Sequence, residues 1–238
     1  MNFVAIIPAK KKSFRIPNKN LTKYKSKTLL ENTIIQAKKS KLLDEIYIST
    51  DSQKIREISK KYRVSLLPLR SKKYSGKKAS MHSVITHELK KIKKFFRYVV
   101  ILQPTSPLRT SKDIDDACKL IYKNKTADCL VSCSELPEEY YPSKIMIKKK
   151  FHIDFFDLKA VFLNNLNIKK TIRLGKKFKS INLKNNNKLL FRNGAIYITK
   201  IDKIKEYIIG GKIISFLMPI ERSLDINEKK DLINLKKF

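Results

Sequence analysis

Short apolar runs alternate with segments of helical periodicity through the first 134 residues. The runs predict buried strands at 3–7, 45–49, 64–67, 98–102 and 130–133. Between them, apolar residues recur at helical spacing near 28–37, 52–61, 84–92 and 110–122. Thr28 with Glu31, and Thr110 with Asp113, have the spacing of residues that cap the start of a helix. This alternation predicts an α/β fold in which helices cover both faces of a mostly parallel sheet.

The alternation fades between about residues 135 and 190, where Lys, Asn and Phe dominate. We interpret this segment as an insertion that pairs with another subunit, within one domain that spans residues 1–238. Beyond it, apolar runs predict strands at 196–198 and 213–217, and a last helix at 228–235.

Composition narrows the class of protein. Hydrophobic residues make up 42% of the 238 residues, which is enough to bury a substantial core. No apolar stretch approaches the roughly 20 residues that span a bilayer, and the first apolar run is too short for a signal peptide. We therefore expect a cytoplasmic protein without a membrane partner. Cys118, Cys129 and Cys133 have no spacing typical of a zinc site, and we expect them to be buried thiols.

The formal net charge of +33 points to anionic partners. Lysine supplies 45 of the 54 basic residues and is spread along the whole chain. Proteins that read nucleic acids usually concentrate charge on one face and use arginine to contact bases and phosphates. We therefore expect no dedicated nucleic-acid partner, although a lysine-rich nucleic-acid-associated protein remains a less favoured alternative. A diffuse basic surface still attracts anionic substrates such as nucleotides.

The ligand of an open α/β sheet binds beyond the carboxyl ends of its strands, so the segments that follow strands carry the candidate chemistry. The segment after the first strand, 8–20, contains lysines and Arg15, which can neutralise a triphosphate, with Ser13 and Asn20 as neutral donors. It contains no glycine and is therefore not a Walker loop. The alternative interpretation is a charged surface loop.

The segment 103–109 follows the most hydrophobic strand and reads Gln-Pro-Thr-Ser-Pro-Leu-Arg. Its two prolines restrict φ and stiffen the loop. Gln103 can both donate and accept hydrogen bonds, and Arg109 can bind a carboxylate or phosphate through two nitrogens. The alternative is a turn that leads into the helix capped by Thr110.

Two later segments are further candidates. Asn193 to Tyr197 precedes a predicted strand, and Gly194 permits a positive φ or a close backbone approach. Asp225 and Asn227 lie two residues apart, so an extended segment would point both oxygens the same way, as Mg²⁺ ligands. The alternatives are a turn into the strand and an aspartate that caps a helix.

Together these segments resemble the acylneuraminate cytidylyltransferases, or CMP-sialic acid synthetases, over nearly the whole chain and in the family's order. The resemblance rests on the first loop, 49–51, Arg70, 103–109, 193–197 and 223–227. It implies a Rossmann-like α/β fold with a small dimerisation extension, and thus a homodimer. It also implies a reaction: a CTP-dependent enzyme transfers CMP to an acidic nine-carbon (nonulosonic) sugar and releases pyrophosphate.

The resemblance also assigns roles to residues. Lys10, Lys19, Gln103 and Asp225 would be catalytic. The nucleotide would be bound by Ser13, Asn20, Arg70 and Ser80, and the sugar by Gln103, Arg109, Arg192 and Asn193. Mg²⁺ would be held by Asp225 and Asn227. The segment 193–197 is more similar to the neuraminic and legionaminic branches than to the pseudaminic branch.

Several positions depart from the family's pattern. The first loop usually reads Ala-Arg-Gly-Gly-Ser-Lys, whereas here Lys10 replaces the arginine, Phe14 replaces the lysine and both glycines are absent. Asn227 stands where an aspartate is usual, and Lys77 where many relatives have aspartate. These departures leave a second hypothesis open: a family member that binds nucleotide with little turnover.

Overall fold

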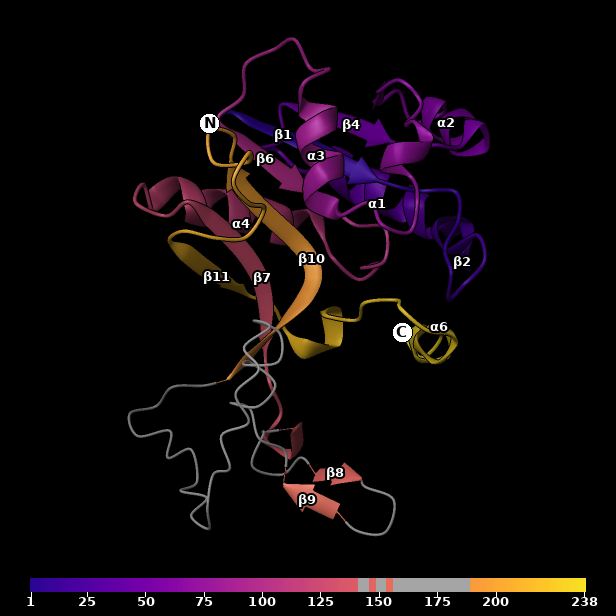
Figure 1. Ribbon diagram of the computed structural model, residues 1–238, viewed down its shortest axis with the longest axis vertical. Helices are drawn as coiled ribbons and strands as arrows, with labels where there is room; N and C mark the ends of the chain where they lie inside the picture. The colour runs from indigo at the N-terminus through magenta and orange to yellow at the C-terminus, as the bar shows by residue number, and fades with distance from the viewer. Residues whose placement is uncertain (141–145, 149–152, 156–188) are drawn as a thin grey trace. The chain divides into compact units, whose positions relative to one another are not determined.

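The computed structural model describes residues 1–140, 146–148, 153–155 and 189–238, and the chain divides into two compact units (Figure 1). The first unit comprises Met1–Ser134 and Arg192–Phe238. The second, Glu135–Phe191, contains η3 (Glu138–Tyr140) and an antiparallel pair of strands, β8 (Met146–Lys148) and β9 (Ile153–Phe155). The second unit covers the segment where the sequence alternation fades, and its predicted part in dimerisation stays a prediction.

A seven-stranded sheet with the order β11-β7-β10-β6-β1-β4-β5 forms the centre of the first unit. Its strands are β1 (Phe3–Pro8), β4 (Glu45–Ser49), β5 (Ser65–Leu66), β6 (Tyr98–Ile101), β7 (Cys129–Glu135), β10 (Leu190–Lys200) and β11 (Ile213–Leu217). The pairs β1·β4, β1·β6, β4·β5 and β7·β11 are parallel, whereas β10 is antiparallel to β6. The predicted mostly parallel sheet is thus confirmed.

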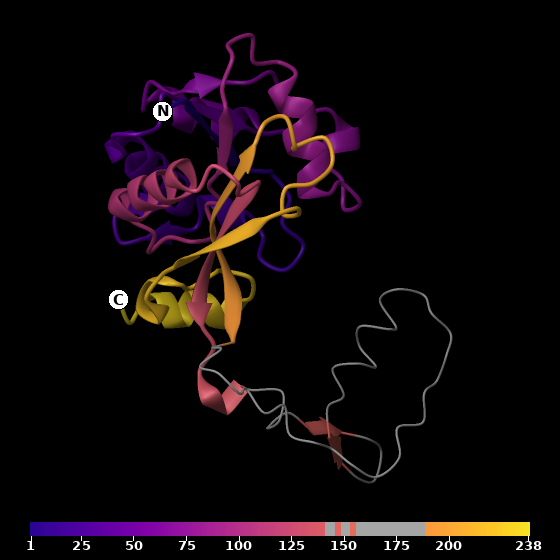
Figure 2. The same cartoon turned by 90° about the vertical axis from the view of Figure 1, so that its left-hand side faces the viewer.

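Helices cover both faces of this sheet. They are α1 (Leu29–Lys39), α2 (Gln53–Lys60), α3 (Met81–Leu89) and α4 (Ser111–Lys123). After the last strand, α6 (Lys229–Leu235) packs in a separate cluster with Ile16, Leu29 and Ile226. Short 3-10 helices lie at η1 (Lys19–Leu21), η2 (Lys72–Tyr74) and η5 (Ile220–Arg222), and β2 (Lys23–Tyr24) pairs with β3 (Lys27–Thr28). Figure 2 shows α4 and α3 on opposite sides of the strands.

The two faces build two hydrophobic cores because successive side chains of a strand point in opposite directions. In β1, Phe3, Ala5 and Ile7 join the core that contains residues of α1, α2 and α4. Val4 and Ile6 join the second core, which α3 covers. Both faces of β1 are therefore buried, which explains why it reads as a continuous apolar run.

Local signals in the sequence place helix starts correctly. Thr28 and Glu31 form a capping box at α1, and Thr110 and Asp113 form one at α4.

Strand β10 departs from expectation: it begins at Leu190, so 193–197 lies inside a long strand and is not a turn before one. In the part of the chain that the structure describes, no helix has the length and apolar character required to span a membrane.

Candidate functional site

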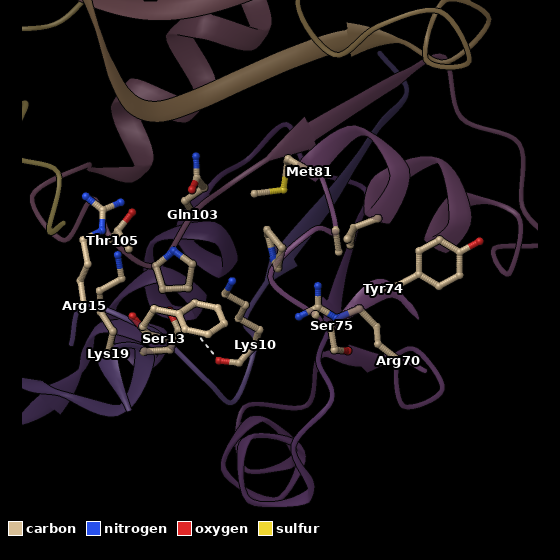
Figure 3. A pocket seen from close by; sticks show the side chains of 17 residues that line it. Lys10, Ser13, Arg15, Lys19, Arg70, Tyr74, Ser75, Met81, Gln103 and Thr105 are labelled. Atoms are coloured by element: carbon tan, nitrogen blue, oxygen red, sulfur yellow. Dashed lines mark hydrogen bonds between the residues drawn. The ribbon is translucent and has the colours of Figure 1, made fainter. Parts of the chain in front are cut away.

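A pocket of about 230 Å³ lies at the carboxyl ends of the parallel strands (Figure 3). It is lined by segments that follow β1, β5 and β6. Six of the residues predicted from the sequence line it: Lys10, Ser13, Lys19, Asn20, Arg70 and Gln103. None of the described residues that line the pocket is acidic, so the pocket suits an anionic ligand.

The first loop is held in place at its base. The backbone N–H of Ala9 donates to the carbonyl of Ser49 at 2.9 Å, and that of Lys11 donates to Asp51 Oδ1 at 2.6 Å. Asn20 is buried, and its Nδ2 donates to the carbonyl of Lys10 at 2.9 Å. Asn20 therefore shapes the loop that presents Lys10 to the pocket.

The side chain of Lys19 lies among several other charged groups of the site. Its Nζ donates to the carbonyl of Ile226 at 2.7 Å. Burial lowers the pKa of Lys19, and the nearby charges of Arg15 and Lys10 lower it further, while Asp225 opposes them. Neighbouring cations and burial disfavour the charged amine, so an anion bound here would relieve an existing penalty.

Arg70 is buried on the other side of the pocket (Figure 3). Its backbone N–H donates to the carbonyl of Thr50 at 2.9 Å, whereas its Nε and Nη2 have no hydrogen-bond partner among the described residues. Burial lowers the pKa of Arg70, and the charges of Asp51 and Glu88 oppose that shift. Two unpaired guanidinium donors beside a cavity are suited to the acceptor atoms of a ligand.

Arg109, which the sequence predicted as a substrate ligand, is buried inside the protein. It is only 2% exposed, and its Nη1 donates to the carbonyls of Ala195 at 2.7 Å and of Gln103 at 3.2 Å. Burial lowers the pKa of Arg109 to about 10, although Asp113 opposes the shift. This side chain turns inward and fastens the 103–109 loop to β10, which leaves Gln103 in the pocket. The contact of Arg109 with substrate therefore stays a prediction.

Asn193 was also predicted to bind substrate, and it too is buried, at 1% exposure. Its Oδ1 accepts from Ser132 Oγ at 2.6 Å and from the N–H of Ala195 at 3.2 Å. Its Nδ2 donates to Ser223 Oγ at 3.0 Å. This network joins β7, β10 and the segment that precedes Asp225, so Asn193 supports the site from within the protein.

Asp225 lies close enough to Lys19 for their charges to interact, and Lys19 Nζ donates to the carbonyl of the next residue, Ile226. The Oδ2 of Asp225 accepts from Asn227 Nδ2 at 2.7 Å, and its Oδ1 is buried without a partner among the described residues. Gly194 has a φ of 74°, and a Cβ there would lie 3.1 Å from Asp225 Oδ2. A glycine at this position is therefore what lets the carboxylate pack against β10.

The donor set around Asp225 fits a magnesium site with one carboxylate. Mg²⁺ often binds through one or two carboxylates and completes its shell with water and phosphates, and Asp225 Oδ1 has no other described partner. Asn227 donates its amide N–H to Asp225 and so holds that carboxylate, and its role as a metal ligand stays a prediction. Among the described residues, no three His, Cys, Asp or Glu side chains are grouped to hold a metal.

Ser80 and Arg192 lie outside the pocket lining. Ser80 is exposed at the N-cap of α3, where its Oγ accepts from the N–H of Ser83 at 3.0 Å. Arg192 is exposed on β10. Their predicted contacts with nucleotide and sugar remain predictions.

Arg15, which the sequence placed among the cations of the first loop, also lines the pocket, as do Tyr74, Ser75 and Thr105, to which the sequence assigned no role (Figure 3). The ring of Tyr74 stacks on His87 with centroids 3.9 Å apart. Arg15 and Thr105 lie in segments that directly follow strands, so the rule that ligands bind beyond strand ends could have found them. Tyr74 and Ser75 follow no strand directly, and only the path of the chain after β5 brings them to the pocket.

Comparison with known proteins agrees with this geometry. The cytidylyltransferase family matches residues 4–207. The N-acylneuraminate cytidylyltransferase of Escherichia coli is 29% identical over 96% of this chain and 50% of that protein. The CMP-N,N'-diacetyllegionaminic acid synthase of Legionella pneumophila is 35% identical over 50% of this chain and 53% of that protein. The chain thus spans about half the length of these relatives.

A third relative acts on a different sugar, and one solved structure supports the fold. The 3-deoxy-manno-octulosonate cytidylyltransferase of Francisella tularensis is 27% identical over 76% of this chain and 73% of that protein. A CMP:2-keto-3-deoxy-manno-octonic acid synthetase, solved with CTP, has a TM-score of 0.68 at 12% identity over 100% of this chain and 98% of that chain. The family match over most of the chain, together with the fold, shows that this chain belongs to the cytidylyltransferase family.

Proposed function

We infer that this chain transfers CMP from CTP to a nonulosonic, sialic-acid-like sugar and releases pyrophosphate. The observation that carries the proposal is the pocket at the strand ends. It gathers Lys10, Lys19 and Arg70 from separate segments with no acidic residue in its described lining. Such a lining suits a triphosphate, and the family match supports CTP as the donor.

In the reaction, a hydroxyl of the sugar forms a bond to the α-phosphorus of CTP and loses its proton, while the bond to the β-phosphate breaks. Pyrophosphate is the leaving group. Positioning and neutralisation of charge are the protein's main contributions to such a transfer. Lys10 and Lys19 would bind phosphate oxygens, and the free donors of Arg70 would contact acceptor atoms of the nucleotide. Gln103 would orient the sugar.

Asp225 would hold Mg²⁺ through its unpaired Oδ1, and the bound ion would neutralise charge on the phosphates. The sugar class is supported by relatives named for neuraminic and legionaminic acids, and by the resemblance of 193–197 to those branches. A relative named for 3-deoxy-manno-octulosonate makes that eight-carbon sugar the main competitor.

The test is pyrophosphate release from purified protein with Mg²⁺, CTP and a panel of acidic sugars that includes the eight-carbon competitor. We expect release with a nine-carbon sugar, a strong preference for CTP over UTP, and loss of turnover in Asp225→Asn. Asp202→Asn is the matched control, because Asp202 is an exposed aspartate outside the pocket lining. The proposal would be refuted if no sugar of the panel gave pyrophosphate release while an active relative, assayed in parallel, did.

A second candidate function is nucleotide binding with little turnover. It is favoured by Asn227, whose amide N–H faces Asp225 and supplies no second negative ligand. Calorimetry would then detect CTP binding without pyrophosphate release. In that case Asn227→Asp should raise turnover, and an unchanged rate would count against this candidate.

We also propose that the protein is a homodimer in which the second unit, Glu135–Phe191, takes part. Light scattering coupled to size-exclusion chromatography measures the mass directly. A monomer at micromolar concentration would refute this proposal.

A further inference from the structure

Phe14 is a large apolar residue in an unusual place. It lines the pocket, yet 62% of it is exposed, so burial in a core does not explain it. Its ring lies beneath two ammonium groups: Lys10 Nζ is 5.4 Å from the ring centroid, and Lys77 Nζ is 5.7 Å from it. Both distances fall within the range of cation–π attraction.

The two lysines come from different parts of the chain. Lys10 belongs to the first loop, and Lys77 lies between η2 and α3, next to Gly76 in the pocket lining. Figure 3 shows Lys10 between the first-loop residues Ser13 and Lys19 on one side and Arg70 on the other. One ring therefore connects two loops at the pocket.

Neither ammonium group is paired with a carboxylate: within the described chain, Lys10 and Lys77 form no ion pair. Two like charges near each other repel, and the negative face of an aromatic ring offsets part of that repulsion. The ring also restricts two flexible side chains, whose ordering otherwise costs conformational entropy when a ligand binds.

We propose that Phe14 is a positioning residue that holds Lys10 and Lys77 as a paired cation clamp for a polyphosphate. This inference rests on the proposed function, because the polyphosphate would be that of CTP. It adds Lys77, which lies outside the pocket lining, to the proposed phosphate site. It also assigns a role to Phe14 in the first loop, which contains no glycine. The clamp would contact the phosphates of CTP and make no contact with the cytosine base.

Calorimetry on the full chain tests the clamp with three probes: CTP, cytidine and inorganic tripolyphosphate. Phe14→Leu should weaken binding of CTP and tripolyphosphate about two- to fivefold, the effect of losing cation–π contacts at an exposed site. Binding of cytidine should not change. Phe14→Trp should bind as the wild type does, because its ring retains the π face. Phe95→Leu is the matched control, since Phe95 is 83% exposed and lies outside the pocket lining.

Lys77→Met tests the second half of the clamp and does not depend on the stability of the Phe14 variants. It should weaken CTP binding, and Phe14→Leu should have a smaller effect in that background than in the wild type. Equal weakening of CTP and cytidine would mean that the ring contacts the base and would overturn the inference. Wild-type affinity in Phe14→Leu would overturn it as well.

The same experiment separates this inference from the proposed function. Tripolyphosphate binding that depends on Phe14, without any turnover of CTP, would support the clamp and refute the enzyme activity. CTP turnover that Phe14→Leu leaves unaffected, in rate and in KM, would refute only the clamp. A chain that binds neither anion would overturn both.

Discussion

Replacing Asn193 by alanine removes the centre of a buried hydrogen-bond network. The side chain accepts from Ser132 Oγ at 2.6 Å and from the N–H of Ala195 at 3.2 Å, and it donates to Ser223 Oγ at 3.0 Å. All of these groups are buried. Water therefore cannot replace the lost partner without entering the protein.

The expected cost follows from these contacts. The hydrogen bonds with Ser132 and Ser223 contribute about 1 kcal/mol each, and a buried N–H left without an acceptor costs about 1–3 kcal/mol. The Ser132 hydroxyl can rotate toward another acceptor, so we count only the N–H of Ala195 as stranded. The free energy of unfolding should fall by about 3–5 kcal/mol. In a chain of this length that corresponds to a decrease in Tm of about 6–20 °C.

Thermal and urea unfolding followed by circular dichroism measure this loss. Arg192→Ala is the matched control, because Arg192 is the adjacent residue and is exposed. A surface substitution of this kind should change stability by no more than about 0.5 kcal/mol. If Asn193→Ala were as stable as Arg192→Ala and instead raised the KM for the sugar, Asn193 would be a substrate ligand and the structural role would be refuted.

Three further predictions follow from the described contacts. Gly194→Ala should destabilise the fold by about 1 kcal/mol and lower turnover more than CTP affinity, because φ is 74° and the new Cβ would meet Asp225 Oδ2 at 3.1 Å; unchanged kinetics would contradict this. Burial raises the pKa of Asp113, but hydrogen bonds from Arg222 and Thr110 outweigh it and hold the pKa below 3.8. The stabilisation is therefore present above pH 3.8 and is lost as the pH falls through the lowered pKa, so Arg222→Gln should cost about 1–2 kcal/mol at pH 7. That difference from the wild type should shrink in urea titrations below pH 3.8, and a difference that grows there would refute the assignment. The three cysteines are buried and free, and burial raises the pKa of each thiol, so a thiol reagent at pH 8 should react with them only after unfolding; rapid reaction of the native protein would count against this.

Predictions that depended on local chemistry were confirmed. The capping boxes at Thr28 and Thr110 need only residues three positions apart, and both start helices where the sequence places them. The apolar runs at β1 and β6 are continuous because both faces of a central parallel strand are buried. Since strand ends in such a sheet carry the ligand site, the sequence alone also located Lys10, Ser13 and Gln103 at one pocket.

The tertiary structure alone decided which polar side chains face the ligand and which face the protein. Arg109 and Gln103 share one loop, yet the arginine turns inward because the carbonyl of Ala195, 86 residues away in the chain, accepts its hydrogen bond. Asn193 is buried because Ser132 and Ser223 lie beside it once β10 has inserted between β6 and β7. Residue type and spacing determined that these side chains need partners. The order of the strands in the sheet determined which residues those partners are, and the pattern of apolar and polar residues does not reveal that order.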